Sequence, residues 1–103
     1  MKILNYKSKR YLCSINKKLI ISRSEGSCVI KNIEAESTLI MNETTAFLFD
    51  VMNDNEYVDE EFIINKLSGS YIHLPSERQM KAKIEGVIDK LINEGIILIE
   101  REI

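Results

Sequence analysis

The sequence predicts an α+β fold in which three short antiparallel strands are followed by three helices. The first observation is a pair of strand-like runs on either side of a glycine-containing turn, which is typical of a hairpin. The second is the run over residues 37–67, STLIMNETTAFLFDVMNDNEYVDEEFIINKL, in which a short apolar strand passes into an amphipathic helix, an acidic turn and a second short helix. A strand edge that leads into a helix-turn-helix is a binding architecture, and this run contains no candidate catalytic centre.

The strands are predicted from short apolar runs that turn residues separate. Residues 18–22 (KLIIS) and 28–31 (CVIK) flank a glycine-containing turn, which suits a tight hairpin. Residues 32–36 form a second turn, and residues 37–41 form the third strand. This strand contains no proline, and only Glu36 before it supplies the charge that usually protects a free edge. We therefore expect an edge that is open to pairing.

The first helix is predicted from a capping residue and an apolar stripe. Asn42 is a good N-cap residue, and Glu43 in the first turn complements the positive end of the helix dipole. The apolar face consists of large side chains, with one more at its margin: Phe47, Leu48, Val51 and Met52, then Phe49. Residues 53–55 (NDN) end the helix.

Two further helices also begin at capping residues. Asp59 caps a helix that runs to Leu67 and buries Phe62 and Ile63. Residues 76–79 (SERQ) form a capping box directly after a proline, with serine at the N-cap and glutamine three residues later. This box predicts the start of the third helix.

The third helix is expected to run to about Glu94, where Gly95 provides a standard stop. Read at about 100° per residue, its core-facing positions are Met80, Ile84, Val87 and Leu91. One shoulder of the helix carries Lys81, Ile88 and Ile92, and the other shoulder carries Lys83, Gly86 and Lys90. Each shoulder therefore presents a lysine. The apolar tail at residues 96–99 is expected to pack back on the body as a short strand.

Charge is divided unevenly along the chain. Residues 1–31 carry 8 basic side chains and 1 acidic side chain, whereas the other 72 residues carry 6 basic and 15 acidic side chains. We interpret residues 1–16 as a basic N-terminal arm, extended or mobile, and residues 17–103 as one folded domain. A basic arm indicates an acidic partner (a peptide, nucleic acid or membrane) or a solvated tail, and both interpretations stay open.

Composition argues against several classes of protein. The chain has no apolar run of the roughly 18 residues that a membrane helix needs and no secretory signal behind Lys2, so we expect a cytoplasmic protein without membrane partners. Cys13 and Cys28 are interpreted as reduced thiols that pack as small apolar residues. The single histidine, His73, has no cysteine or serine partner at a recognisable spacing and is interpreted as a loop residue. We therefore predict no metal, no cofactor and no enzymatic activity.

A resemblance to a known family rests on the residues that follow the third strand. Residues 41–49 (MNETTAFLF) match a pattern of Leu-Asn-Glu-Thr followed by small and then large apolar residues. The arrangement over about residues 18–100 resembles the PqqD-like family, which includes the peptide chaperone of pyrroloquinoline quinone biosynthesis and the RiPP recognition elements. Met41 and Asp59 stand where leucine and threonine are usual, and both differences are chemically conservative.

The resemblance implies a winged helix-turn-helix that binds the leader of a ribosomally synthesised precursor peptide. In this family the leader adds as a strand to the third strand, in a groove walled by the third helix. A free edge provides N–H and C=O groups, which give affinity without dictating side-chain sequence. The family performs no chemistry on the peptide, and delivers it to a separate maturation enzyme such as a radical enzyme, a cyclase or a leader peptidase.

The candidate peptide-binding residues under this resemblance come from the third strand and the third helix. They are Ser37, Thr38, Leu39, Ile40, Met41, Arg78, Lys81, Lys83, Ile84 and Ile88. Lysines beside the edge suit the acidic leaders that are common in the family. The alternative is that Lys81 and Lys83 are solvated helix residues that pair with Glu77 and Glu85. Which shoulder of the helix faces the peptide is left open.

A DNA-binding winged-helix regulator is the second hypothesis, with the third helix in the major groove and the basic arm on phosphates. Residues 76–94 contain 4 basic and 4 acidic side chains, so this helix has no net positive charge. The acidic body of the chain would also repel phosphate. Charge therefore favours peptide binding over nucleic-acid binding.

Overall fold

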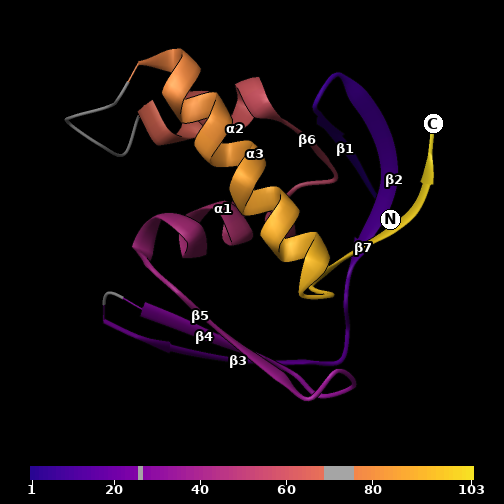
Figure 1. Ribbon diagram of the computed structural model, residues 1–103, viewed down its shortest axis with the longest axis vertical. Coiled ribbons are helices and arrows are strands. Elements are labelled where there is room, and N and C mark those ends of the chain that lie inside the picture. Colours follow the sequence, from indigo (N-terminus) through magenta and orange to yellow (C-terminus); the bar gives the residue numbers. More distant parts are fainter. Residues whose placement is uncertain (26, 69–75) are drawn as a thin grey trace.

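The computed structural model describes residues 1–25, 27–68 and 76–103. Within these ranges the chain forms three helices and seven strands, and the strands build two sheets (Figure 1). Helix α1 (Glu43–Asp54) packs on the three-stranded sheet, whereas α2 (Glu60–Ser68) and α3 (Glu77–Asn93) contact strands of the four-stranded sheet. The predicted α+β class is confirmed. His73 and the hairpin glycine, Gly26, lie outside the described residues.

The three-stranded sheet, called sheet B, has the predicted composition and order. Its strands are β3 (Leu19–Ser24), β4 (Ser27–Asn32) and β5 (Ser37–Met41), in the order β3-β4-β5 with antiparallel pairing throughout. Ile30 in the central strand lies opposite Ile21 on one side and Leu39 on the other. The last residue of the turn into β5 is Glu36, which has φ 53° and so adopts a left-handed conformation. β5 therefore forms one edge of the sheet.

The four-stranded sheet, called sheet A, corrects the prediction for residues 1–16. These residues are a hairpin of β1 (Lys2–Tyr6) and β2 (Lys9–Ile15), in a sheet of order β6-β1-β2-β7 with β6 (Tyr57–Asp59) and β7 (Ile97–Glu102). The two-residue turn at Lys7 and Ser8 has φ values of 52° and 62°. Hairpin turns of this type usually contain glycine or asparagine, so the sequence offers no turn signal here. The segment is an integral part of a sheet, and no arm is present.

The helix caps follow the predictions closely. The Asn42 side chain accepts a hydrogen bond from the Thr45 N–H at 2.8 Å. Asp59 accepts one from the Phe62 N–H at 2.6 Å, and both bonds of the capping box at Ser76 are present. Each cap satisfies an N–H group that the first turn of a helix leaves without an intrahelical partner.

The end of α3 is fixed by Gly95 and by two buried asparagines. Gly95 has φ 72°, and a Cβ atom there would lie 2.9 Å from Asn32 Nδ2. Asn32 donates to the Glu94 carbonyl at 3.2 Å, and Asn16 donates to the Gly95 carbonyl at 3.0 Å. Asn32 belongs to sheet B and Asn16 directly follows β2 of sheet A, so both sheets hold this turn. The tail forms the expected strand as β7, and its partner is β2, which the prediction did not include as a strand.

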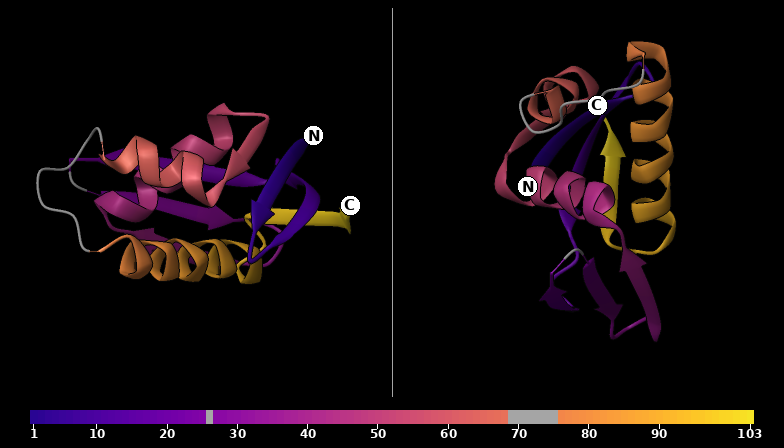
Figure 2. Two further views of the ribbon diagram at one scale, coloured as in Figure 1. Left: turned by 90° about the horizontal axis from the view of Figure 1, so that it is seen from above. Right: turned by 90° about the vertical axis from the view of Figure 1, so that its left-hand side faces the viewer.

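The core draws on both sheets and all three helices. Its fully buried large side chains include Leu4 of β1, Ile30 of β4, Phe49 of α1, Ile63 of α2 and Leu91 of α3. Figure 2 shows the helices packed together over sheet B, with sheet A beside them. This single core explains why the N-terminal hairpin is held in place, since burying its apolar side chains stabilises the whole body.

The buried stripe of α3 differs from the predicted one at a single position. Met80, Ile84, Ile88 and Leu91 are buried, whereas Val87 is only partly buried. The helix is therefore turned toward the shoulder that carries Ile88. The prediction placed no second sheet against this shoulder, and β1 and α2 are the elements that cover it.

Candidate functional site

Sheet edges are the places in this fold where backbone N–H and C=O groups stay open to pairing. In the described part of the chain, four strands lie at edges, β3 and β5 in sheet B and β6 and β7 in sheet A. β6 has 3 residues and ends in Asp59, β7 carries Glu100, Arg101 and Glu102, and β3 carries Arg23. β5, with the sequence STLIM, has no charged side chain. Because short length and charge are the usual protections of an edge, β5 is the unprotected one.

The side chains of β5 alternate between the core and the outer surface. Leu39 and Met41 are buried, and Ser37 on the same face is partly buried. Thr38 is exposed, and Ile40 is 71% exposed. Burial of this row holds β5 against α1 and the rest of sheet B. The free backbone groups of β5 are therefore held in a fixed position. All five strand residues of the predicted site are thus in one rigid element.

β5 also lies on the side of the molecule where α3 runs. The right-hand view of Figure 2 shows β5 as the strand of sheet B on the α3 side, with β3 on the far side. α1 contacts both β5 and α3 and so connects the strand edge to the helix. A strand added to β5 would therefore extend sheet B toward the α3 side.

The predicted residues of α3 fall into two groups by exposure. Arg78, Lys81 and Lys83 are exposed. Ile84 and Ile88 are each 1% exposed and belong to the core. Direct contact between these two side chains and a peptide would require the core to open. In the structure they support the helix from beneath and offer no surface to a ligand.

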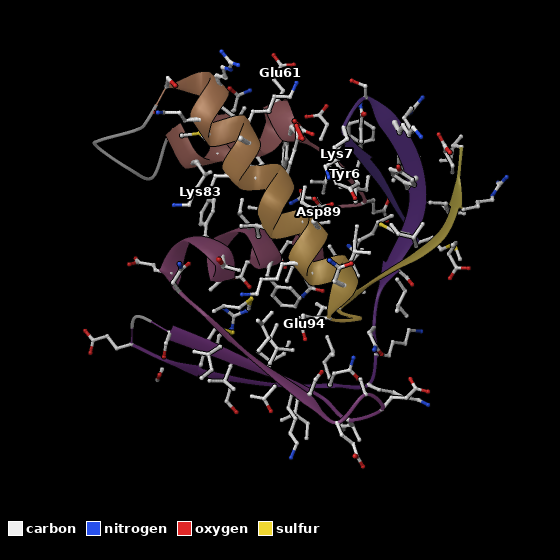
Figure 3. All side chains as sticks on the ribbon, viewed as in Figure 1. Tyr6, Lys7, Glu61, Lys83, Asp89 and Glu94 are labelled. Atoms are coloured by element: carbon white, nitrogen blue, oxygen red, sulfur yellow. The ribbon has the colours of Figure 1, made fainter. Side chains whose placement is uncertain are left out.

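The two lysines lie on opposite shoulders of α3, and the structure distinguishes them. Lys81 Nζ is 3.9 Å from a carboxylate oxygen of Glu60, so Lys81 takes part in a contact between α3 and α2. Farther along the same shoulder, Tyr6 donates to Asp89 at 3.1 Å. Figure 3 shows Lys83 on the other side of α3 from Tyr6, Lys7 and Asp89. The shoulder of Lys83 is the one turned away from sheet A.

Helical spacing extends the Lys83 shoulder to two residues that were not in the predicted site. Val87 and Lys90 follow Lys83 at i+4 and i+7, which places the three on one side of the helix. Val87 is partly buried and Lys90 is exposed. Arg78 precedes Lys81 by three residues and so shares the opposite shoulder. Val87 was missed because periodicity alone assigned it to the core.

No family model matches the chain, and no curated protein matches it. Among solved structures, TbiB1 in complex with the TbiA(beta) leader peptide matches with a TM-score of 0.69 and 9% identity, over 84% of this chain and 94% of that chain. A lasso peptide synthetase B1 complexed with the leader peptide matches with a TM-score of 0.68 and 13% identity, over 84% and 96%.

The chain shares the fold of these two proteins. Each of them was solved with a leader peptide bound, and each is matched over nearly its full length. The likeness agrees with the fold that the resemblance to the PqqD-like family implies. At identities of 9% and 13% the likeness is one of backbone architecture.

The described residues contain no group of three or more histidine, cysteine, aspartate or glutamate side chains that could hold a metal ion. Across residues 1–25, 27–68 and 76–103, no helix has the length and hydropathy needed to cross a membrane. Cys13 and Cys28 are buried free cysteines, as predicted, and burial raises the pKa of the Cys13 thiol. A raised pKa keeps that thiol protonated and unreactive at neutral pH.

Proposed function

We propose that this protein binds the leader of a ribosomally synthesised precursor peptide by strand addition to β5. The supporting observation is the uncharged free edge of β5 in a fold shared with two proteins that were solved with leader peptides bound. In strand addition the main-chain hydrogen bonds supply affinity, and the neighbouring side chains select the sequence. The protein acts as a binding module and performs no chemistry on the peptide.

The side chains around the edge define the leader that would fit. Ile40 and Thr38 form the exposed row of β5, so one row of leader side chains would lie beside an apolar and a hydroxyl-bearing residue. On the helix side, Lys83 and Lys90 are exposed cations, with Val87 between them. We expect a leader that combines apolar residues at alternate positions with an acidic residue near this shoulder.

Binding without chemistry is useful when a separate enzyme modifies the same peptide. If the protein also contacts that maturation enzyme, it raises the effective concentration of precursor at the active site. A radical enzyme, a cyclase and a leader peptidase are the proposed classes of partner. Because affinity lies in the leader, the core segment stays free for modification.

A calorimetric titration with three peptides tests the proposed function. The full precursor, the leader alone and the core alone are each titrated into the protein. The full precursor and the leader should bind with similar affinity, and the core should show no binding. Equal affinity for the core would contradict the proposal.

Charge reversal on α3 tests which shoulder faces the leader. Lys83→Glu should weaken binding of an acidic leader roughly three- to fivefold, because an exposed charge contributes a modest energy. Arg78→Glu makes the same change of charge on the opposite shoulder and should leave the affinity within error of the unmodified protein. The reverse ranking would place the peptide on the Lys81 shoulder.

A further inference from the structure

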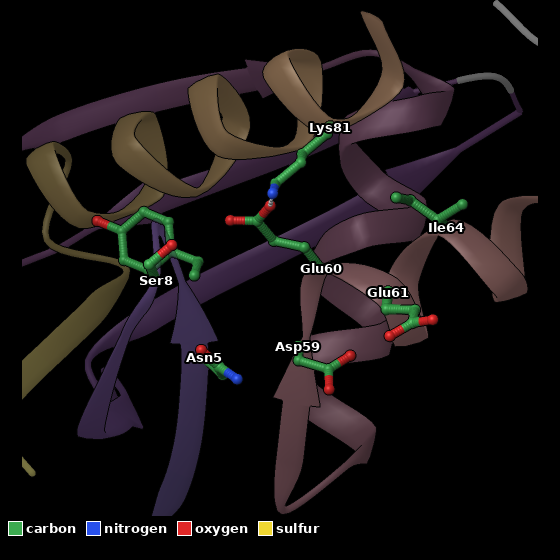
Figure 4. A pocket seen from close by; sticks show the side chains of 8 residues that line it. Asn5, Ser8, Asp59, Glu60, Glu61, Ile64 and Lys81 are labelled. Carbon is green, nitrogen blue, oxygen red and sulfur yellow. Dashed lines mark ion pairs between the residues drawn. The ribbon is translucent and has the colours of Figure 1, made fainter. Parts of the chain in front are cut away.

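A pocket lies on the shoulder of α3 that faces sheet A, away from β5. It has a volume of about 400 Å³ and is open to solvent. The residues that define its chemistry are Asn5, Ser8, Asp59, Glu60, Glu61 and Lys81. Figure 4 shows the Glu60 side chain extending from the start of α2 into the space between Lys81 and Ser8. The pocket thus joins the β1–β2 turn, the end of β6, and helices α2 and α3.

Glu60 is the unusual group in this pocket. It is only 7% exposed, although carboxylates are rarely buried without full pairing. One oxygen, Oε1, accepts a hydrogen bond from the Lys7 N–H at 2.7 Å. The other oxygen, Oε2, is buried and has no hydrogen-bond partner among the described residues. Lys81 Nζ is 3.9 Å from Oε2, which is beyond hydrogen-bond distance.

The charges around Glu60 leave an excess of negative charge. Asp59 and Glu61 line the same pocket, and the carboxylate of Glu85 on α3 also acts on Glu60. Burial raises the pKa of Glu60, and the charge of Glu85 raises it further, whereas the Lys7 N–H and Lys81 lower it. Lys7, the other cation nearby, is paired with Asp89. Among the described residues that line the pocket, Lys81 is the one basic side chain, against three acidic ones.

We propose that this pocket binds an organic cation, a guanidinium or alkylammonium group, that donates a hydrogen bond to Glu60 Oε2. A guanidinium carries several N–H donors in one plane, so it can bond to Oε2 and to a second carboxylate at the rim. The described residues hold no cluster suited to a metal ion, which favours a ligand with N–H donors. The site is separate from β5 and does not depend on leader binding.

The cation comes either from a free small molecule or from a lysine or arginine side chain of a partner protein. Both sources offer the same donor group, and two probes separate them. Agmatine represents a free cation. A capped Gly-Arg-Gly peptide represents a side chain on a backbone, and the same peptide with citrulline in place of arginine is its neutral control.

The experiment follows backbone amides and side-chain carboxyl carbons by NMR while each probe is added. At least one cationic probe should cause saturable shifts at Ser8, Glu60 and Glu61 and should lower the pKa of the Glu60 carboxyl, because a bound cation stabilises its charged form. The citrulline peptide should cause none. Saturation by agmatine alone indicates a free cation, and saturation by the arginine peptide indicates a partner side chain. No saturable shift with either cationic probe overturns the proposal.

Variants separate a binding role for Glu60 from a structural one. In Glu60→Gln the amide oxygen can still accept from the Lys7 N–H, so the β1–β2 turn is retained while the charge is lost. This variant should bind the cationic probe at least ~10-fold more weakly. Glu61→Gln changes an exposed rim residue and should weaken binding by a smaller factor, whereas Glu100→Gln on β7 should have no effect. Equal affinity in Glu60→Gln and Glu100→Gln would overturn the assignment of Oε2.

Discussion

At the scale of single residues, Tyr6 shows how the N-terminal hairpin is tied to α3. Its hydroxyl donates to Asp89 Oδ1 at 3.1 Å, and the Lys7 ammonium bonds to the other oxygen of the same carboxylate. Burial, together with the hydrogen bond and charge of Asp89, raises the pKa of Tyr6 to about 12. The neutral phenol is therefore the form that the folded state favours.

This raised pKa predicts a loss of stability at alkaline pH. An unfolded tyrosine deprotonates near pH 10, whereas folded Tyr6 keeps its proton until about 12. The stabilisation is complete below pH 10 and is lost as pH rises through this window, because the unfolded state then releases a proton that the folded state retains. Ultraviolet difference absorbance should show a late tyrosine titration that Tyr6→Phe removes. Asp89→Asn should move its pKa down toward 10, and an unchanged titration in Tyr6→Phe would disprove the assignment.

A second prediction concerns two glycines that differ in backbone conformation and in the space around an added Cβ atom. Gly95→Ala places a side chain at φ 72° and a Cβ atom 2.9 Å from Asn32 Nδ2, so it should destabilise the protein by about 1–3 kcal/mol. Gly86→Ala lies inside α3 with nothing within 4 Å of the added Cβ atom, and should stabilise it by about 0.5–1 kcal/mol. Urea denaturation of both variants measures the difference, and equal effects would show that backbone conformation does not decide the outcome.

At the scale of elements, the local sequence was sufficient to predict the helix caps but not to predict sheet A. Asn42, Asp59 and Ser76 each cap a helix through a side chain that reaches a neighbouring N–H group, so the signal is contained within four residues. β6 is only three residues long and exists because it pairs in parallel with β1, some fifty residues earlier. Such a pairing leaves no periodicity in the local sequence.

The same contrast applies to the candidate site. The bounds of β5 match the predicted strand, because a short apolar run marks the strand and the Asn42 cap marks its end. Only the tertiary structure shows which shoulder of α3 faces sheet A. Helical spacing places Lys81 and Lys83 on opposite shoulders but does not distinguish the two shoulders. Glu60 was not among the predicted site residues. Its burial depends on the β1–β2 turn, whose residues Lys7 and Ser8 carry no turn signature.

The proposed use of β5 predicts a specific pattern of amide exchange. In an antiparallel edge strand, alternate N–H groups bond to the neighbour and the others face outward. The outward amides of β5 should exchange rapidly in the free protein and slowly once a leader peptide is bound. β3 is the opposite edge of the same sheet, so its outward amides serve as an internal control and should not change. Protection of β3 in place of β5 would contradict the proposed site.

At the scale of the whole molecule, the N-terminal hairpin shares the core with the helices. Leu4 and Cys13 are completely buried, and β1 and β2 provide the pairing partners for β6 and β7. The division at residue 16 that the charge distribution predicts would separate these strands from their partners. Charge therefore varies along the chain in a way that does not follow the boundaries of the core.

Removal of residues 1–16 tests the two descriptions directly. Loss of the hairpin should abolish the cooperative thermal transition, because it exposes buried side chains of the core and leaves β6 and β7 unpaired. Differential scanning calorimetry of the shortened chain measures this. The full-length Glu100→Gln variant serves as a reference that should keep the transition. A shortened chain that unfolds cooperatively near the original temperature would restore the interpretation of residues 1–16 as an arm.

The paired asparagines at the end of α3 have a consequence for the kinetics of association. Asn16 and Asn32 hold carbonyl groups of one turn from two different sheets, and both side chains are largely inaccessible to water. These hydrogen bonds fix the position of sheet B relative to α3 in the absence of a ligand. A peptide that adds to β5 then meets a surface that is already assembled, so the entropy lost on ordering falls on the peptide alone. Association should be a single diffusional step, without a slow rearrangement of the protein.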